Sequence, residues 1–353
     1  MSAPEFSAQM AGCPLPIGQY DRVVLGHGSG GRLSGDLLKQ VFLPAFQNEV
    51  VAALEDQATL PVPAGRIAFT TDSFVVRPLF FPGGDIGRLA VNGTINDLAV
   101  GGATPLYLSA AFIIEEGLEI AELRRVVESM SDACREAGVK MVTGDTKVVD
   151  RGKGDKLFIT TSGIGVVPEE ISLSIANARP GDAVIVSGTL GDHGMAVMSV
   201  REGLEFETEL KSDTAPLHTL VELMLRQCPA IRCMRDPTRG GLSSTLNEIA
   251  VAARVGIRIR ETDLPVRPEV RGACELLGFD PLYVANEGKV VAIVPAARAT
   301  ELLAAMRTHP LARDAMIIGE VLERTPGVVT LKAATGGERI VALLAGEQLP
   351  RIC

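Results

Sequence analysis

Residues 96–106 of the chain have the sequence NDLAVGGATPL, which joins a helical pattern to a strand pattern. The apolar periodicity of residues 85–100 predicts a helix that ends at the glycine pair 101–102, because glycine readily terminates a helix. The apolar residues of 106–114 predict a strand directly after it. A helix that leads at once into a strand is typical of α/β proteins, so this segment predicts an α/β or α+β fold.

Strands and helices alternate outward from this segment in both directions. In the first half we expect helices over 34–46, 85–100 and 120–137 and strands over 67–69, 106–114, 139–143 and 157–167. In the second half we expect strands over 183–187, 290–294 and 315–321, helices that begin near 195 and 241, and a closing hairpin over 327–332 and 338–344. The length of 353 residues fits about two domains.

The pattern breaks at Pro168, which places a domain boundary there. We expect a flexible glycine-rich segment at 1–35, an N-terminal domain at 36–167, a C-terminal α/β domain at 168–344 and a flexible tail at 345–353. The tail ends in Cys353, and Pro350 favours an extended approach to that residue.

The composition argues against several classes of partner. The net charge is −9, no dense run of Lys and Arg occurs, and the chain has no Trp and three Tyr. Binding to nucleic acid or to an anionic membrane is therefore not expected. No apolar run is long enough to span a bilayer and no signal peptide is recognisable, so we expect a cytoplasmic protein. In that compartment the six cysteines are not expected to form disulfides.

Four acidic residues are expected at turns or strand ends, where open α/β sheets bind ligands. They are Asp72, Asp97, Asp145 and Glu287. Each one alone is also explained as a turn or helix cap. Together, with Gly, Thr or Asn beside each of them, they suit Mg²⁺, which prefers oxygen ligands and in turn binds polyphosphates.

Three further features suit phosphate binding. Lys147 can hold a γ-phosphate, or act as a base if its pKa is lowered, although a solvated lysine explains it equally well. The stretch Gly26–Gly31 is no P-loop, but its N–H groups can cradle phosphate, and a flexible linker is the alternative. The segment Asp236–Gly241 places N–H groups at the start of a helix, where the alternative is simple capping.

The last residue, Cys353, places a thiol on an arm that can move between sites. The α-carboxylate of Cys353 disfavours the thiolate, and the neighbouring Arg351 partly offsets this effect. A prenylation signal is excluded, because that signal places its cysteine four residues from the end.

Four segments together resemble the ATP-binding superfamily of aminoimidazole ribonucleotide synthetase, selenophosphate synthetase and thiamine-phosphate kinase. The segments are Thr71–Ser73, Asn96–Leu106, Gly144–Thr146 and Asp236–Leu242. Within that superfamily the chain resembles the HypE family of nickel–iron hydrogenase maturation factors. The features that carry this second resemblance are Gly26–Gly31, Gly144–Val149 and the ending Pro350-Arg351-Ile352-Cys353. Selenophosphate synthetases carry a reactive cysteine near the N-terminus, but Cys13 is followed by Pro14 and Leu15 and does not fit that context.

The resemblance implies two α/β domains with mixed sheets flanked by helices. The first domain would bind ATP and form a homodimer through its sheet. A carbamoyltransferase, HypF, would load a carbamoyl group on Cys353, ATP would phosphorylate the carbamoyl oxygen, and loss of phosphate would leave a thiocyanate. The cyanide would then pass to iron held by a HypC–HypD complex.

The resemblance also assigns roles to residues. Asp97 and Lys147 become the candidates for proton transfer or phosphate stabilisation, and Glu287 is expected beside the reacting carbamoyl group or a metal. Mg²⁺ would be held by Asp72, Asp97 and Asp145. The residues expected to bind ATP are Gly28, Gly30, Gly31, Asp72, Asn96, Asp97, Thr146, Lys147 and Asp236.

Two alternatives stay open from the sequence. The first is an ATP-dependent synthetase or kinase of the same superfamily, which would have a small-molecule pocket that does not involve Cys353. The second is a carrier that binds nucleotide only as a switch, which would show no ATP turnover even when its thiol is loaded.

Overall fold

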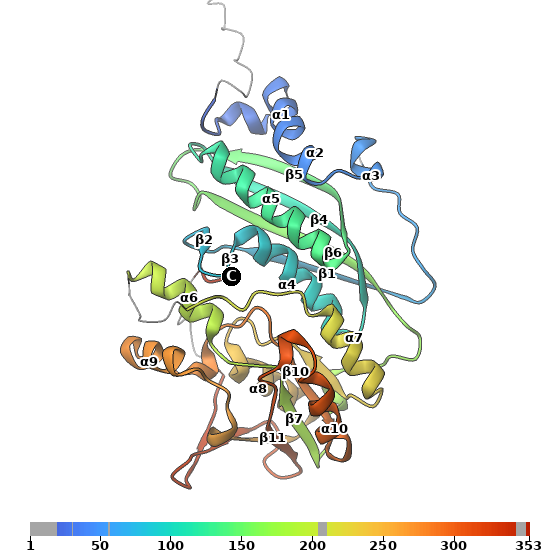
Figure 1. Ribbon diagram of the computed structural model, residues 1–353, viewed down its shortest axis with the longest axis vertical. Coiled ribbons are helices and arrows are strands. Elements are labelled where there is room, and N and C mark those ends of the chain that lie inside the picture. Colours follow the sequence, from blue (N-terminus) through green and yellow to red (C-terminus); the bar gives the residue numbers. More distant parts are fainter. Residues whose placement is uncertain (1–19, 30, 56, 204–209, 344–350) are drawn as a thin grey trace, which may run out of the picture.

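A four-stranded sheet forms the centre of the first domain in the computed structural model, which describes residues 20–353 except 30, 56, 204–209 and 344–350 (Figure 1). The strands are β1 (Arg66–Phe74), β4 (Thr104–Glu115), β5 (Lys140–Val149) and β6 (Leu157–Val167), in the order β1-β6-β4-β5. Strands β4 and β5 are parallel, and the other two neighbouring pairs are antiparallel. A short hairpin of β2 (Phe80–Phe81) and β3 (Gly84–Asp85) follows β1.

Helices α4 (Ile86–Val100) and α5 (Ile120–Ala137) lie along the sheet of this domain (Figure 1). The apolar stripe of α5, including Leu123, Val127 and Met130, is fully buried, which explains why the expected helix over 120–137 forms with the expected bounds. Asp85 caps the start of α4, and its side chain accepts hydrogen bonds from the N–H groups of the first turn. Nearly every residue of α4 is buried, because the helix lies between the sheet and the second domain.

The opposite face of the sheet exposes large apolar side chains. Ile67, Phe69 and Ile113 are 64%, 68% and 44% exposed. These residues alternate along their strands with side chains that face α4, as the period of a strand requires. The sheet is thus covered on one face and apolar on the other.

Short helical segments precede the sheet. They are η2 (Leu25–Gly28), α1 (Arg32–Leu37), the π-helical turn η3 (Leu38–Phe42), α2 (Leu43–Ala45) and α3 (Glu49–Ala52). The helix expected over 34–46 corresponds to α1, η3 and α2. Leu37, Val41 and Phe42 bury its apolar face.

A seven-stranded sheet organises the second domain. Its order is β13-β12-β9-β11-β7-β10-β8. The strands are β7 (Asp182–Val186), β8 (Cys233–Arg235), β9 (Gly256–Arg260), β10 (Val291–Pro295), β11 (Met316–Leu322), β12 (Val329–Lys332) and β13 (Glu338–Ile340). The helices are α6 (Asp192–Arg201), α7 (His218–Gln227), α8 (Gly241–Ala253), α9 (Pro268–Leu277) and α10 (Ala296–Met306). Single 3₁₀ turns are η4 (Ile175–Asn177), η5 (Glu261–Asp263), η6 (Pro281–Tyr283) and η7 (Pro310–Ala312).

The structure confirms the expected fold class of two α/β domains and corrects two strand ends. Asp72 lies inside β1 and Asp145 inside β5, whereas the sequence placed both at turns after shorter strands. The strands continue because β1 pairs with β6 and β5 pairs with β4 through both acidic residues. Asp97 lies inside α4, in agreement with the helix expected over 85–100.

The expected boundary near Pro168 falls in the segment that joins β6 to β7. Residues 1–19 of the expected N-terminal segment and residues 345–350 of the expected tail lie outside the described residues. Among the helices that the structure describes, none combines the length and apolar character needed to cross a membrane.

Candidate active site

Two carboxylates of the first domain meet between β1 and α4. Asp72 points to the face of the sheet that α4 covers, where its carboxylate lies close to Gly93. Asp97 lies near the end of α4, and the Thr70 hydroxyl donates a hydrogen bond to its Oδ2 at 2.7 Å. Burial raises the pKa of Asp72 to about 6, and the charge of Asp97 acts in the same direction, while Arg239 opposes it. A cation bound here would relieve this repulsion.

The second domain adds two acidic residues to this cluster. Asp236 follows β8, and Glu287 lies in the loop before β10. Burial raises the pKa of Asp236 to about 7, with Asp97 as the second cause. Burial also raises the pKa of Glu287 well above its usual value, and Asp213 acts in the same direction. Glu287 is 3% exposed, and its Oε1 has no hydrogen-bond partner among the described residues, so this atom is oriented for a ligand.

The C-terminal thiol lies in the same cluster. The side chain of Ile352 is 3% exposed and packs into the larger hydrophobic core, which places Cys353 beside Glu287. The thiol lies beside the Glu287 carboxyl group, and each group influences the pKa of the other. Burial, and then the charge of Glu287, raise the pKa of Cys353 well above its usual value. Figure 1 shows this end of the chain between β3 and α6, at the junction of the domains.

Asn96 and Asp213 hold the loop that carries Glu287, and sequence reasoning assigned neither residue this role. The Asn96 amide donates to the carbonyl oxygens of Ala215 and Glu287, both at 3.1 Å. The Asp213 carboxylate accepts from the N–H groups of Glu287 and Gly288 at 3.1 and 3.3 Å. Asn96 was expected to contact ATP, but its amide is engaged with the protein.

Asp145 lies on the other face of the first sheet. The register places Asp145 beside Ala111, Ala111 beside Thr160, and Thr160 beside Ser73. Because neighbouring side chains of a strand point to opposite faces, Ser73 and Asp145 share the face that Asp72 avoids. Asp145 and Asp72 also lie on opposite edge strands of the sheet.

This arrangement changes the expected metal site. Asp72 and Asp97 are brought together, whereas Asp145 pairs with Lys147 at 3.4 Å, with both side chains about two-thirds exposed. Across the described residues, no group of three or more His, Cys, Asp and Glu side chains could hold a metal ion. One chain by itself therefore does not assemble the triad of Asp72, Asp97 and Asp145.

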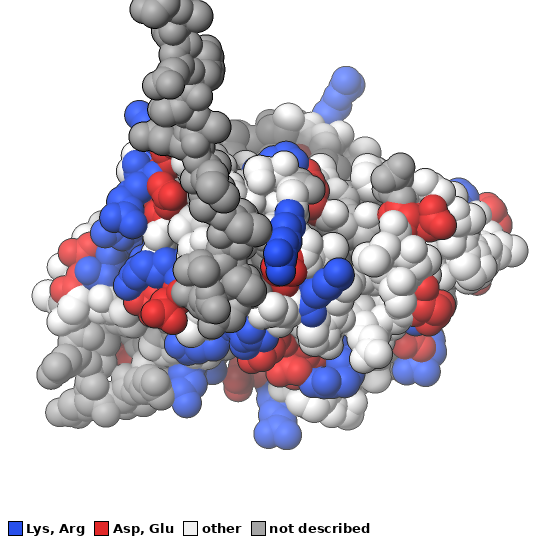
Figure 2. Space-filling view, turned by 90° about the horizontal axis from the view of Figure 1, so that it is seen from above, with Lys and Arg blue, Asp and Glu red and all other residues white. Residues whose placement is uncertain are grey.

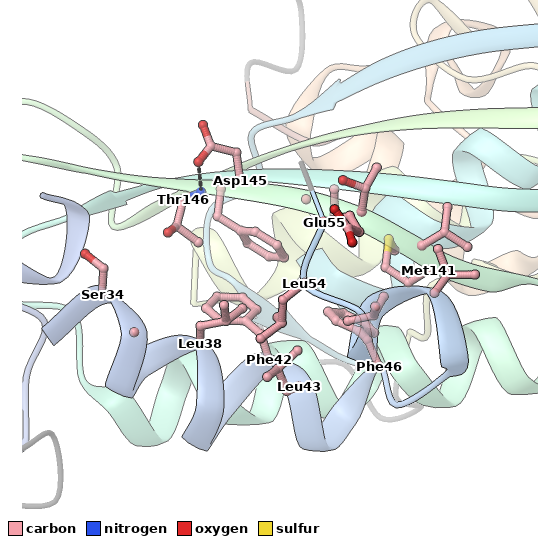
Figure 3. A pocket seen from close by; sticks show the side chains of 18 of the residues that line it. Ser34, Leu38, Phe42, Leu43, Phe46, Leu54, Glu55, Met141, Asp145 and Thr146 are labelled. Atoms are coloured by element: carbon pink, nitrogen blue, oxygen red, sulfur yellow. Dashed lines mark hydrogen bonds between the residues drawn. The ribbon is translucent and has the colours of Figure 1, made fainter. Parts of the chain in front are cut away.

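A cavity of about 480 Å³ lies between the N-terminal helices and strands β4 and β5. Figure 3 shows Leu38, Phe42 and Phe46 extending from the helices toward the strands, and Asp145 pointing away from them. The cavity is lined at one end by residues of the two segments expected to bind nucleotide. They are Gly28, Gly31, Asp145, Thr146 and Lys147.

The glycine-rich stretch packs directly on β5. A Cβ atom at Gly28 would lie 2.5 Å from the backbone nitrogen of Val148, so only glycine permits this approach. The contact places Gly28 beside the strand that carries Thr146 and Lys147. Gly30 lies outside the described residues.

A second cavity, of about 450 Å³, opens at the domain junction beside the acidic cluster. Its lining includes Thr70, Asp97, Arg235 and Asp236. The side chains in its wall thus carry both signs of charge. Space next to Asp97 and Asp236 suits a bound polar group larger than water.

The end of the molecule that carries α1 presents charged side chains of both signs (Figure 2). Figure 2 views the end of the molecule that carries α1, and Lys and Arg side chains alternate there with Asp and Glu. The described part of this face shows no extended basic patch.

Comparisons with known proteins match this architecture. Two family models cover the chain: AIR synthase related protein, N-terminal domain, at residues 54–167, and AIR synthase related protein, C-terminal domain, at residues 179–332. Carbamoyl dehydratase HypE of Cupriavidus necator is 58% identical over 341 residues, which is 96% of this chain and 97% of the relative. Carbamoyl dehydratase HypE of Escherichia coli K12 is 48% identical over 338 residues, or 94% of this chain and 100% of the relative.

Solved structures agree with the sequence relatives. A crystal structure of hydrogenase maturation protein HypE in complex with ATP has a TM-score of 0.90 at 49% identity, and covers 94% of this chain and 99% of that chain. A crystal structure of a HypE–HypF complex has a TM-score of 0.77 at 51% identity, and covers 89% of this chain and 100% of that chain. Thiamine monophosphate kinase of Aquifex aeolicus, at 21% identity and a TM-score of 0.58, shares the fold.

The two matched domains and the junction between them place this chain in the AIR synthase related superfamily, as the sequence motifs indicated. Within that superfamily the chain belongs to the HypE family. Its enzyme class is carbamoyl dehydratase, and its process is hydrogenase maturation.

The raised pKa values of the acidic cluster predict an unusual pH dependence of stability. Folding raises the pKa of Asp72 from 3.8 to about 6 and that of Asp236 from 3.8 to about 7. The folded state therefore binds more protons than the unfolded state between these values. The stabilising contribution of the two groups is complete below pH 3.8 and is lost as pH rises through 6 to 7.

The comparison of Asp72→Asn with the wild type isolates this effect. We expect the variant to lose less unfolding free energy than the wild type between pH 5 and pH 8, measured by urea titration without divalent cations. Parallel curves for the two proteins would contradict the assigned pKa of Asp72.

Proposed function

We propose that this chain uses ATP to dehydrate a carbamoyl group carried on the Cys353 thiol. The carbamoyl oxygen accepts the γ-phosphoryl group, the C–O bond then breaks with phosphate as the leaving group, and the nitrogen releases two protons. The thiocarbamate thereby becomes a thiocyanate, and ATP becomes ADP and phosphate. The observation that carries the proposal is the thiol of Cys353 beside Glu287, within a cluster of carboxylates.

Glu287 is the group best placed to exchange a proton with the carbamoyl group. Its carboxyl contacts the thiol that would carry the substrate, and its Oε1 has no partner within the described structure. Burial raises the pKa of Glu287 well above its usual value, which favours the protonated carboxyl group and makes it a proton donor to the carbamoyl group. Asp213 and Asn96 hold its backbone, so the carboxyl group is oriented before substrate arrives.

Asp97 and Lys147 remain the two candidates for proton transfer or phosphate stabilisation. Asp97 lies in the cluster with Asp72 and accepts a hydrogen bond from Thr70. Lys147 lies on the open face of the sheet, paired with Asp145. Within one chain Asp97 belongs to the acidic cluster that contains Asp72, whereas Lys147 does not, so a role for Lys147 requires a second copy.

Mg²⁺ fits the donor set of this site in part. Asp72 and Asp97 supply hard oxygen atoms whose mutual repulsion a divalent cation relieves, and Mg²⁺ usually completes its shell with water and substrate phosphates. We propose that these two residues hold the ion, with Asp145 contributed from a second copy. The ion would neutralise charge on the phosphates of ATP.

We propose that the second copy pairs with this one through the open face of the first sheet, as a homodimer. Ile67, Phe69 and Ile113 expose an apolar surface on that face, which association would bury. Asp145 and Lys147 lie on the same face, so pairing can carry them toward the acidic cluster of the partner. The nucleotide would then bind between the two chains, with its phosphates at the cluster and the segment of Gly28 over it.

The partners follow from the same proposal. A HypF-type carbamoyltransferase would load Cys353, in keeping with the solved complex of HypE with HypF. A HypC–HypD complex would accept the cyanide. We place these reactions in the cytoplasm, where ATP is available.

Mass spectrometry of the C-terminal peptide tests the proposal. The chain is incubated with HypF, carbamoyl phosphate and ATP, with and without Mg²⁺. We expect Cys353 to gain a carbamoyl group in the presence of HypF. This carbamoyl group should then lose one water only when the mixture contains both ATP and Mg²⁺. Glu287→Gln is expected to accept the carbamoyl group but to lose water ~10²-fold or more slowly, because it lacks the proton-exchanging group.

Three outcomes would contradict the proposal in different ways. An unmodified Cys353 with ATP consumed on a small metabolite would indicate an ordinary synthetase of the superfamily. A loaded thiol with no ATP turnover would indicate a nucleotide-switched carrier. Normal dehydration by Glu287→Gln would show that Glu287 takes no part in the reaction, while Cys353 would still be the residue that carries the carbamoyl group.

A further inference from the structure

Besides the buried side chain of Ile352, two backbone carbonyl groups hold the last three residues of the chain. The carbonyl oxygen of Arg351 accepts from the Arg77 N–H at 3.2 Å and from the Arg201 guanidinium at 2.6 Å. The carbonyl oxygen of Ile352 accepts from Nε2 of His193 at 2.9 Å. Contacts to two successive carbonyls set the register of the tail, and therefore the position of the residue that follows.

His193 is built for this contact. It lies in α6, is fully buried, and packs edge-on against Phe81 with ring centroids 5.4 Å apart. A carbonyl oxygen can only accept, so Nε2 must carry the proton. Ser212 Oγ lies 2.8 Å from Nδ1 and donates to it, which fixes this tautomer of the neutral ring. Burial lowers the pKa of His193, although the facing carboxylate of Asp213 and the Ile352 carbonyl oppose that shift, so the ring stays neutral.

The segment that fixes His193 also fixes Glu287. Ser212 is followed by Asp213, whose carboxylate accepts from the N–H groups of Glu287 and Gly288. A Cβ atom at Gly288 would lie 1.8 Å from the carbonyl oxygen of Asp213, so the two backbones are in direct contact. One short segment thus sets the position of both the ring that holds the tail and the carboxyl group that faces the thiol.

We propose that His193 is a positioning residue that holds Cys353 against Glu287. Its ring, fixed in one tautomer, donates a hydrogen bond to the Ile352 carbonyl oxygen. The reason for holding Cys353 in this position rests on the proposed function. The position itself requires neither ATP nor a carbamoyl group. The ion pair of Arg351 with Asp155 at 2.5 Å is partly exposed and holds the tail weakly. The buried histidine is the contact whose loss leaves a carbonyl unsatisfied.

Alkylation of the thiol measures the seating without any activity. Full-length wild type, His193→Leu and His193→Gln are treated with iodoacetamide, and modification of the C-terminal peptide is followed by mass spectrometry. A seated thiol has a raised pKa and reacts slowly. We expect His193→Leu to react about tenfold faster at Cys353, and His193→Gln, whose amide can donate in place of Nε2, to stay close to the wild type.

An equal increase in both variants would assign His193 a packing role and overturn the proposal, as would no increase in a folded His193→Leu chain. A second measurement covers the case in which the leucine variant does not fold. The chain has four histidines, so nitrogen-resolved NMR can follow each ring. Removal of residues 351–353 from the wild type should shift the NMR signal of one imidazole ring. That signal should be the one that is missing in His193→Gln. No response of any histidine would also overturn the proposal.

The outcomes separate this inference from the proposed function. If the position of Cys353 depends on His193 but Cys353 never gains a carbamoyl group, the role of His193 stands and the proposed function is rejected. If Cys353 is carbamoylated and dehydrated but its position does not depend on His193, the proposed function stands and the role of His193 is rejected.

Discussion

Replacement of Cys353 with serine is expected to reduce dehydration, and the ATP turnover that depends on HypF, to the background measured without the dehydratase. A serine hydroxyl is a far weaker nucleophile than a thiol and is not activated without a dedicated base. The raised pKa of Glu287, the side chain that contacts position 353, favours its protonated form, which cannot take a proton from a hydroxyl group. Serine is close in size to cysteine, so the tail should still seat through the Ile352 carbonyl.

Cys13→Ser is the matched control for this variant. Superfamily members of the selenophosphate synthetase type carry a reactive cysteine near the N-terminus, and although the context of Cys13 does not fit theirs, Cys13 is the cysteine of this chain nearest to that position. We expect Cys13→Ser to retain wild-type turnover in the same coupled assay. Loss of activity in Cys13→Ser with normal activity in Cys353→Ser would reject the C-terminal carrier.

Chains with Lys147→Met and chains with Asp97→Asn are each expected to lose ~10²–10⁴-fold in dehydration rate. Co-expressed in equal amounts, they should regain about a quarter of wild-type activity, because half of the two-fold symmetric dimers are mixed and one of the two sites in each is intact. The reason is geometric. Lys147 lies on the open face of the sheet and Asp97 on the covered face, so a shared site must combine two chains.

Two controls define the result. A chain that carries both substitutions, co-expressed with wild type, should leave the mixed dimers without an intact site. Differently tagged chains and native mass spectrometry should verify that mixed dimers form. Mixed dimers without recovered activity would show that Asp97 and Lys147 act at a site within one chain, and full activity of Lys147→Met alone would show that Lys147 has no role.

Long elements with a strong apolar period were predictable from the sequence. The helix over 120–137 and the strand over 157–167 have the expected bounds, because burial of one helix stripe and of alternate strand residues dominates both. The strands around Asp72 and Asp145 were expected to be too short. An acidic residue beside threonine or glycine resembles a turn in sequence, while pairing with β6 and β4 keeps both segments extended in the structure.

The acidic residues and the terminal cysteine were recognisable as site candidates from their types and neighbours. The sequence did not show which of these residues lie together in space. The sequence joined Asp145 to Asp72 and Asp97, but the alternation of a strand separates them onto two faces of one sheet. His193 and Asp213 carry no motif, because their roles come from contacts with residues distant in sequence, such as Ile352 and Glu287.

The sequence by itself determined the α/β class, the chemical character of the site and the presence of a thiol at the end of the chain. These properties depend on residue type and local periodicity, which the order of residues states directly. Only the tertiary structure decided that Cys353 meets Glu287, that Asn96 joins the domains, and that Lys147 faces away from the cluster. Such relations arise from the packing of two domains against α4 and from the two faces of a sheet, which bring together residues that no local pattern connects.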